Sequence, residues 1–215
     1  MGLDNTLISL FVGHAPGKAD IEAAGAAVGS WAGEEGLAIA DSMEATEKIV
    51  LLQIADEPWI TPLRTEFEMD EGTAKSWAAS LSRHVGKPVV GGIMHDSDLI
   101  GLFLAVNGDE TGSLDVSDLY FGGELSSEAE EDLSAWQAVV DGAAGVEKLQ
   151  QLWAAREANP AETLASICAA IRLDAGGAAG FGAARWFLTA DSLEMPPDKR
   201  PVPTRVLAEI GVSDG

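Results

Sequence analysis

Short runs of aliphatic residues, bounded by glycine, proline or acidic residues, mark the first quarter of the chain. Three such runs, at Leu7–Gly13, Leu37–Ala40 and Lys48–Ala55, have the length and the boundaries of β-strands. An alanine-rich stretch from Ile21 to Trp31 separates the first two runs and favours a helix. We therefore expect the chain to begin as a mixture of strands and helices.

A helix with one apolar face is predicted at residues 70–85. Trp77, Leu81 and Val85 recur every four residues, and this spacing places them on one side of a helix. Gly86 follows, and a glycine can adopt the left-handed conformation with which helices often end. We expect Trp77 to be a core residue.

The next part of the chain predicts consecutive antiparallel strands. Val89–Met94 and Leu99–Val106 are apolar runs joined by a short polar link, and Ser113–Val116 is a candidate returning strand. Asn107-Gly108 lies between the last two, and both residues tolerate the positive φ of a tight hairpin turn. Strands with such short links must be antiparallel.

Helical patterns dominate after Gly123. Ser127 and Glu130 form a capping box for a helix over residues 127–140, and a second helix is expected over residues 146–158. A third helix is predicted to begin at Asn159-Pro160, because Asn is a good N-cap and Pro fits the first turn.

These elements predict an α+β protein, with a largely antiparallel sheet and flanking helices followed by a mainly helical C-terminal segment. By region, we expect a mixed α/β sheet region at 1–122 and a helical region at 123–195, with a last short strand at 184–189. An extended, Pro-rich tail is expected at 196–215. The helical region either packs on the sheet within one domain or forms a small domain of its own. The sequence contains no evident internal repeat.

Acidic side chains outnumber basic ones by 35 to 13, and the formal net charge is −22 on 215 residues. The imbalance is also local, because residues 88–147 hold thirteen Asp or Glu residues and no Lys or Arg. Such a surface repels nucleic-acid phosphates and anionic lipids, and it attracts cations and basic proteins. We therefore expect no nucleic-acid or membrane partner. General solubility or adaptation to high salt is an alternative explanation of the same acidity.

Cysteine usage and hydropathy bear on the compartment. Cys168 is the single cysteine, so neither an internal disulfide nor a cysteine-rich zinc site is expected, and its place on an apolar stripe predicts a buried side chain. No apolar run approaches the ~18 residues of a membrane helix. The run from Leu7 to Val12 is too short for a signal peptide. We expect a cytoplasmic protein, and the sequence indicates no oligomeric state.

No catalytic signature is complete in the sequence. The segment from Gly13 to Lys18 lies where a phosphate-binding loop would, but it has three residues between its glycines instead of four, and Ala19 replaces the Ser or Thr. No G-x-S-x-G pattern occurs, and Cys168 has no histidine near it in sequence. We therefore expect a protein that is not an enzyme and that needs no cofactor.

His95-Asp96-Ser97-Asp98 is the first of two acidic loops that are candidate metal sites. Its Asp-x-Asp pattern resembles the motif with which many glycosyltransferases hold a divalent cation against a diphosphate. The same residues also suit an ordinary turn, because Asp and Ser side chains bond to their own backbone in turns.

The second acidic loop, residues 107–118, can be aligned with a calcium-binding EF-hand loop. The oxygen ligands would then come from Asn107, Asp109, Thr111, Ser113, Asp115 and Asp118. Two departures count against the match. The first and last ligands are normally Asp and a bidentate Glu, and the flanking segments should be helices, whereas residues 99–106 predict a strand.

Trp59 is the tryptophan that we most expect to be partly exposed, because it lies beside Pro58 in an acidic segment. An exposed tryptophan often marks an interface. Four acidic residues are expected to contact the same partner: Asp96, Asp98, Asp109 and Glu110.

We therefore predict an acidic, non-enzymatic interaction protein that binds a basic protein through the surface formed by residues 96–132. The alternative is a protein or metal-dependent enzyme that holds Ca²⁺, Mn²⁺ or Mg²⁺ with residues 95–98 or 107–118.

Overall fold

The computed structural model describes residues 6–40, 45–64, 70–95, 98–121, 123, 133–140, 142–173, 190–199 and 203–214. In these residues the chain forms eight strands: β1 (Thr6–Phe11), β2 (Leu37–Ala40), β3 (Glu47–Ile54), β4 (Trp59–Arg64), β5 (Val89–His95), β6 (Asp98–Val106), β7 (Asp109–Asp115) and β8 (Thr204–Asp214).

The same residues form the α-helices α1 (Lys18–Glu34), α2 (Glu71–Val85), α3 (Ser117–Tyr120), α4 (Gly142–Trp153), α5 (Pro160–Ala170) and α6 (Ala190–Glu194). Two short 3-10 helices, η1 (Leu133–Val139) and η3 (Pro197–Lys199), complete the helical elements of the described residues.

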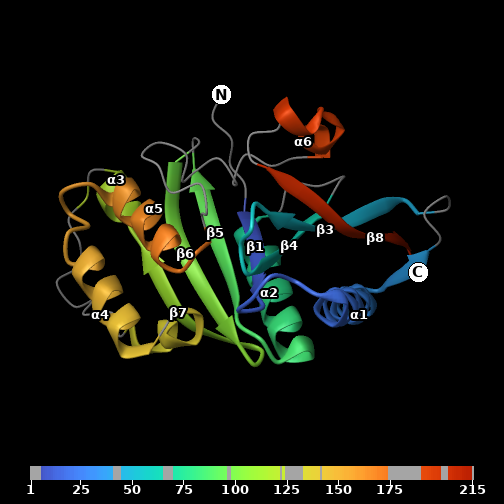
Figure 1. The fold of residues 1–215 in the computed structure, drawn as a ribbon, viewed down its shortest axis with the longest axis horizontal. Helices are drawn as coiled ribbons and strands as arrows, with labels where there is room; N and C mark the ends of the chain where they lie inside the picture. Colours follow the sequence, from blue (N-terminus) through green and yellow to red (C-terminus); the bar gives the residue numbers. More distant parts are fainter. Residues whose placement is uncertain are drawn as a thin grey trace.

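All eight strands belong to one sheet, in the order β2-β8-β3-β4-β1-β5-β6-β7 (Figure 1). Each strand runs antiparallel to its neighbours. The predicted α+β class with a largely antiparallel sheet is therefore confirmed.

The centre of the sheet has the topology of a split βαβ motif. β1, α1, β3, β4, α2 and β5 follow one another along the chain, with β2 inserted after α1, and their strands lie side by side in the order β3-β4-β1-β5. The strand order therefore has a pseudo-twofold relation between β4 and β1. By position in the sheet, β3 corresponds to β5, β8 to β6 and β2 to β7. This repeat of topology has no counterpart that is evident in the sequence.

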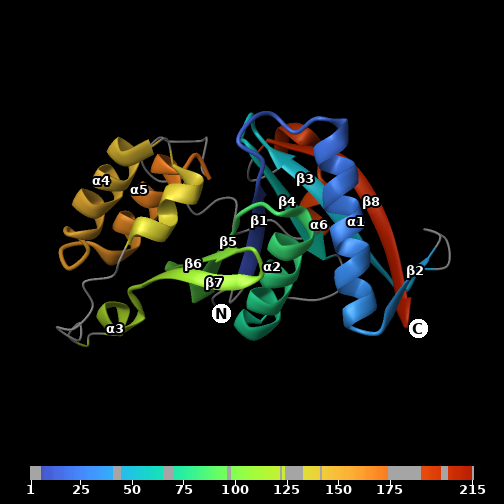
Figure 2. The ribbon, with the colours of Figure 1, turned by 90° about the horizontal axis from the view of Figure 1, so that it is seen from below.

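Helices cover both faces of the sheet (Figure 2). α1 and α2 lie side by side on one face, while η1, α4 and α5 lie on the other. The period of two along a strand explains how both faces are apolar: Ile49 and Leu51 pack toward α1, whereas Val50 and Leu52 belong to the opposite core. The core beneath α1 and α2 includes Trp31 and Trp77, whose rings stack with centroids 4.7 Å apart.

α2 forms where the sequence predicts it. The Asp70 side chain accepts a hydrogen bond from the Thr73 backbone N–H at 3.0 Å and so caps the helix. Gly86 ends the helix with φ of +67°, which only glycine adopts without strain. Trp77 is fully buried, as expected.

The helical segment agrees with the sequence in part. Asn159 caps α5 by accepting from the Glu162 N–H, and Cys168 on this helix is buried, so both expectations are confirmed. Residues 133–139 form a 3-10 helix in place of the predicted α-helix. Residues 124–132, and the strand expected at 184–189, lie outside the described residues.

The expectation of a Pro-rich tail at 196–215 requires a correction. Residues 204–214 form β8, which inserts between β2 and β3 as the second strand of the sheet. Ala208, Ile210 and Val212 alternate with polar or smaller residues, but Leu207 interrupts this period of two where the pairing of β8 with β3 shifts register.

Candidate functional site

The predicted hairpin is formed by β6 and β7, and α2 holds its turn in place. Asn107 and Gly108 make the turn with φ of +55° and +98°, the positive values that favour these two residues. The Gly108 N–H donates to the Ser82 hydroxyl at 2.9 Å. A Cβ at Gly108 would lie 3.2 Å from the Cβ of Arg83, so the turn also packs closely on α2.

Five exposed carboxylates on this hairpin and on α3 form what we call the acidic surface: Asp98, Asp109, Glu110, Asp115 and Asp118. Asp96 and residues 124–132, which were also expected to contribute, lie outside the described residues.

The acidic surface has two ends. Asp109 and Glu110 lie beside the turn, whereas Asp115 pairs in register with Gly101 toward the other end of the hairpin. Six residues of extended strand separate the ends by about 20 Å. Glu110 forms an ion pair with Lys75 of α2 at 3.4 Å, so part of the charge beside the turn is neutralised within the molecule.

An exposed aromatic ring adjoins the end of the hairpin away from the turn. Phe121 follows α3 directly and is 64% exposed. Its ring lies edge-on to the ring of His95 at the end of β5, with centroids 5.1 Å apart. Because His95 pairs in register with Asp98, the aromatic ring and the carboxylates share this end of the sheet. Aromatic residues are enriched at protein interfaces, and polar residues form the rim of such interfaces.

The residues aligned with an EF-hand do not form its loop. Asn107 is in the hairpin turn, and Asp109–Asp115 is an extended strand, so the oxygen donors spread along the strand and point to alternate faces. Among the described residues, no group of three His, Cys, Asp or Glu side chains is placed to hold a metal ion. Residues 107–115 instead form the hairpin that the Asn-Gly turn also predicted, so the EF-hand alignment does not describe their geometry.

The expectation that Trp59 is partly exposed is wrong. Its side chain is fully buried in β4, and the indole N–H donates to the Ile171 carbonyl at 3.3 Å, which joins the sheet to the end of α5. The ring also packs on Phe11 with centroids 4.8 Å apart. Trp59 therefore cannot contact a partner of the folded protein.

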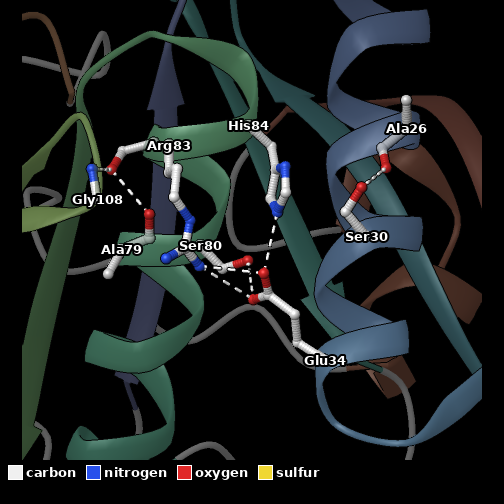
Figure 3. Close-up of polar contacts among 9 residues, drawn as sticks. Ala26, Ser30, Glu34, Ala79, Ser80, Arg83, His84 and Gly108 are labelled. Atoms are coloured by element: carbon white, nitrogen blue, oxygen red, sulfur yellow. Dashed lines mark hydrogen bonds and ion pairs between the residues drawn. The ribbon is translucent and has the colours of Figure 1, made fainter.

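A polar cluster between α1 and α2 was not anticipated from the sequence. The Glu34 carboxylate accepts from the Ser80 hydroxyl at 2.7 Å and from Arg83 at 3.1 Å, and His84 Nε2 lies 3.1 Å from it (Figure 3). The hydrogen bond from Ser80, followed by that with His84, holds the pKa of Glu34 below its ordinary value. Ser80 and His84 both contact the carboxylate, so the arrangement fastens two helices and is not that of a catalytic triad.

A cleft of about 620 Å³ lies between α6 and the strands β3 and β8. Its lining combines the apolar side chains of Val50, Leu193 and Val206 with the carboxylates of Asp191, Glu194 and Glu209. Lys48 also lines it and lies 3.7 Å from Glu209. Nothing in the sequence indicated this cleft, because β8 was expected to be a tail.

Comparisons with known proteins identify no relative: no family model, curated protein or solved structure matches the chain. No helix in the described part of the chain has the length and apolar character needed to cross a membrane.

Proposed function

We propose that this chain is a non-enzymatic interaction protein that binds a basic protein through residues 96–132, of which the acidic surface is the described part. The observation that carries the proposal is the exposed Phe121 ring, which stands at one end of the acidic surface together with Asp98, Asp115 and Asp118. An aromatic anchor supplies contact area, and the carboxylates around it select a partner of opposite charge.

The surrounding sequence supports the same interpretation. Residues 88–147 contain no Lys or Arg, so no basic side chain of this stretch can neutralise the surface. The neighbouring Lys75 of α2 pairs with Glu110, at the opposite end from Phe121. The carboxylates around Phe121 thus place negative charge at this end of the hairpin, and a negative field accelerates encounter with a basic protein.

The test is a pull-down from the source cells at low salt, with elution by a salt step. The triple variant Asp98→Asn, Asp115→Asn and Asp118→Asn is compared with the parent, and the amide that replaces the Asp115 carboxylate would still accept a hydrogen bond from the Ser117 N–H. We expect one basic protein to elute from the parent at moderate salt, because ions screen exposed charges beyond about 10 Å at 0.1 M. The triple variant should lose it.

A matched control variant distinguishes binding at the acidic surface from an effect of the overall negative charge. Asp56→Asn, Glu157→Gln and Asp214→Asn change the net charge by the same amount, and these three carboxylates are exposed on other elements. We expect this control to retain the partner. Equal loss in both triple variants, or capture that does not change with salt, would contradict the proposal and favour solubility or salt adaptation.

A divalent-metal site on residues 95–98 or 107–118 stays a prediction. A rise in melting temperature with Ca²⁺, abolished by Asp109→Asn together with Asp115→Asn, would favour it over the interaction proposal, because a ligand that binds only the folded state stabilises that state.

A further inference from the structure

We propose that the outer edge of β7 binds an extended, basic segment of the partner as an added antiparallel strand. The inference rests on the proposed function and specifies how the partner is bound. Among the described residues, β7 pairs only with β6 and ends the sheet. It spans seven residues, Asp109–Asp115, which corresponds to about 24 Å of edge.

The backbone groups that point outward can be assigned. The Val116 N–H donates to the Ile100 carbonyl at 2.9 Å, so position 116 is directed toward β6. Backbone groups alternate between the two sides of a strand, and the N–H and C=O of Ser113 and Asp115 are therefore directed away from β6. An edge strand of this kind can receive hydrogen bonds from a further strand.

The side chains along this edge favour a basic strand. Asp109, Glu110, Ser113 and Asp115 are exposed, and only Leu114 of β7 is fully buried. In register, Glu110 lies opposite Ala105 and Asp115 opposite Gly101, so both acidic side chains lie on the face covered by α2. A strand with Lys or Arg at every second position would place cations beside Asp115, and also beside Glu110, which already pairs with Lys75 of α2 at 3.4 Å.

The negative charge of the β7 edge also disfavours pairing with an acidic strand. A second copy of this chain carries a net charge of −22, and its β7 would bring like charges directly opposite one another, which destabilises a strand pair. The sheet's other edge, β2, has four residues and no acidic side chain, so it lacks this selectivity. The acidic edge is therefore closed to self-association and open to a basic segment.

The test uses a synthetic seven-residue peptide of alternating Lys and Val, blocked at both ends, titrated at low salt. Ser113→Pro removes one outward N–H and leaves the hydrogen bonds to β6 in place. An edge strand tolerates proline at a position of this kind, where the N–H points away from the sheet. Ser113→Ala keeps the N–H and is the matched control. We expect Ser113→Pro to weaken binding about tenfold, and Ser113→Ala to leave it unchanged.

The outcomes separate this inference from the proposed function. Binding that is equal in the parent and in Ser113→Pro, but weaker in Glu110→Gln with Asp115→Asn, would overturn strand addition and leave the acidic surface as the site. Failure of the peptide to bind the parent would overturn the strand-addition inference, while the pull-down would still test the acidic surface. A second measurement, in the parent protein, is amide hydrogen exchange: the N–H groups of Ser113 and Asp115 should become protected when the peptide binds, and unchanged exchange would overturn the inference.

Discussion

The two halves of the sheet correspond in strand order and direction, but among the described residues they differ in what covers them. The hairpin half consists of β1, β5, β6 and β7, and the cleft half of β4, β3, β8 and β2. On the face away from α1 and α2, the hairpin half is covered by η1, α4 and α5, whereas the five-residue helix α6 lies over the cleft half. Between the described residues of the cleft half lies a space of about 620 Å³.

This difference shows that topology alone does not distribute burial evenly. Leu149 and Trp136, from α4 and η1, are fully buried over the hairpin half, while Leu193 of α6 is only half-buried over the cleft half. The edge that we propose as a binding site thus belongs to the half whose described covering helices contribute these fully buried side chains. A well-packed half holds its edge in one shape, which lowers the entropy lost when a partner strand is added.

The largest loss of stability is expected when the ion pair between Arg64 and Glu47 in the cleft half is broken. Arg64 and Glu47 are joined by two hydrogen bonds of 2.7 Å, both side chains are largely buried, and the guanidinium lies 5.5 Å from the centroid of the Trp31 ring. Arg64→Met would leave the Glu47 carboxylate buried without its partner. We expect a loss of about 3 to 5 kcal/mol in the free energy of unfolding, measured with urea.

Replacing both partners is the control for that variant. Arg64→Met together with Glu47→Met removes the charge as well as the bond, so the double variant should recover much of the stability that the single variant loses. A single variant that unfolds at the same urea concentration as the parent would show that the cleft half does not depend on this pair.

A smaller loss of stability is expected when one leucine is shortened in a covering helix of each half. The same change, Leu→Ala, then compares the two helices directly. Leu149→Ala empties a fully buried position of α4 and is expected to cost about 3 kcal/mol. Leu193→Ala acts on the half-buried position of α6 and should cost about 1 kcal/mol or less, because less apolar area returns to water. Equal losses in urea unfolding would remove the distinction between the two halves.

The smallest change in stability is expected from the polar cluster that joins α1 to α2. Of these two helices, α1 lies beside the cleft half. The folded-state pKa of Glu34 is lowered, chiefly by the Ser80 hydrogen bond, so its contribution is present above the ordinary pKa of 4.5 and is lost as pH falls through the lower, folded-state value. Glu34→Gln should lower the melting temperature at pH 7 and reduce its fall below about pH 4.5. Parallel profiles of melting temperature against pH would contradict this.

Local patterns in the sequence were sufficient for elements whose partners are near in the chain. The capped helix α2 and the hairpin of β6 and β7 follow from residues within a few positions of one another, such as Asp70 with Thr73 and the Asn107-Gly108 turn. The acidity of the hairpin was also evident. These features depend on the period of the side chains and on backbone conformation, both of which the sequence encodes locally.

Other features depend on distant contacts. β4 was not predicted because Pro62 argues against a strand, yet β1 pairs with β4 only at Trp59 and Ile60, so the N–H that Pro62 lacks is not required there. β8 was missed because its partner β3 lies far earlier in the chain, with Ile49 opposite Ile210. The burial of Trp59 depends on Ile171, which lies 112 residues further along the chain, and no local pattern reports it.

The position of β8 between β2 and β3 has a consequence during translation. β3 is synthesised long before β8, so a nascent chain exposes the β3 edge while most of the remaining protein is made. Unpaired strand edges of folding intermediates are prone to aggregate. Ribosome-bound or truncated chains that lack residues 204–214 should therefore be the species that chaperones and proteases recognise, while the finished sheet hides that edge.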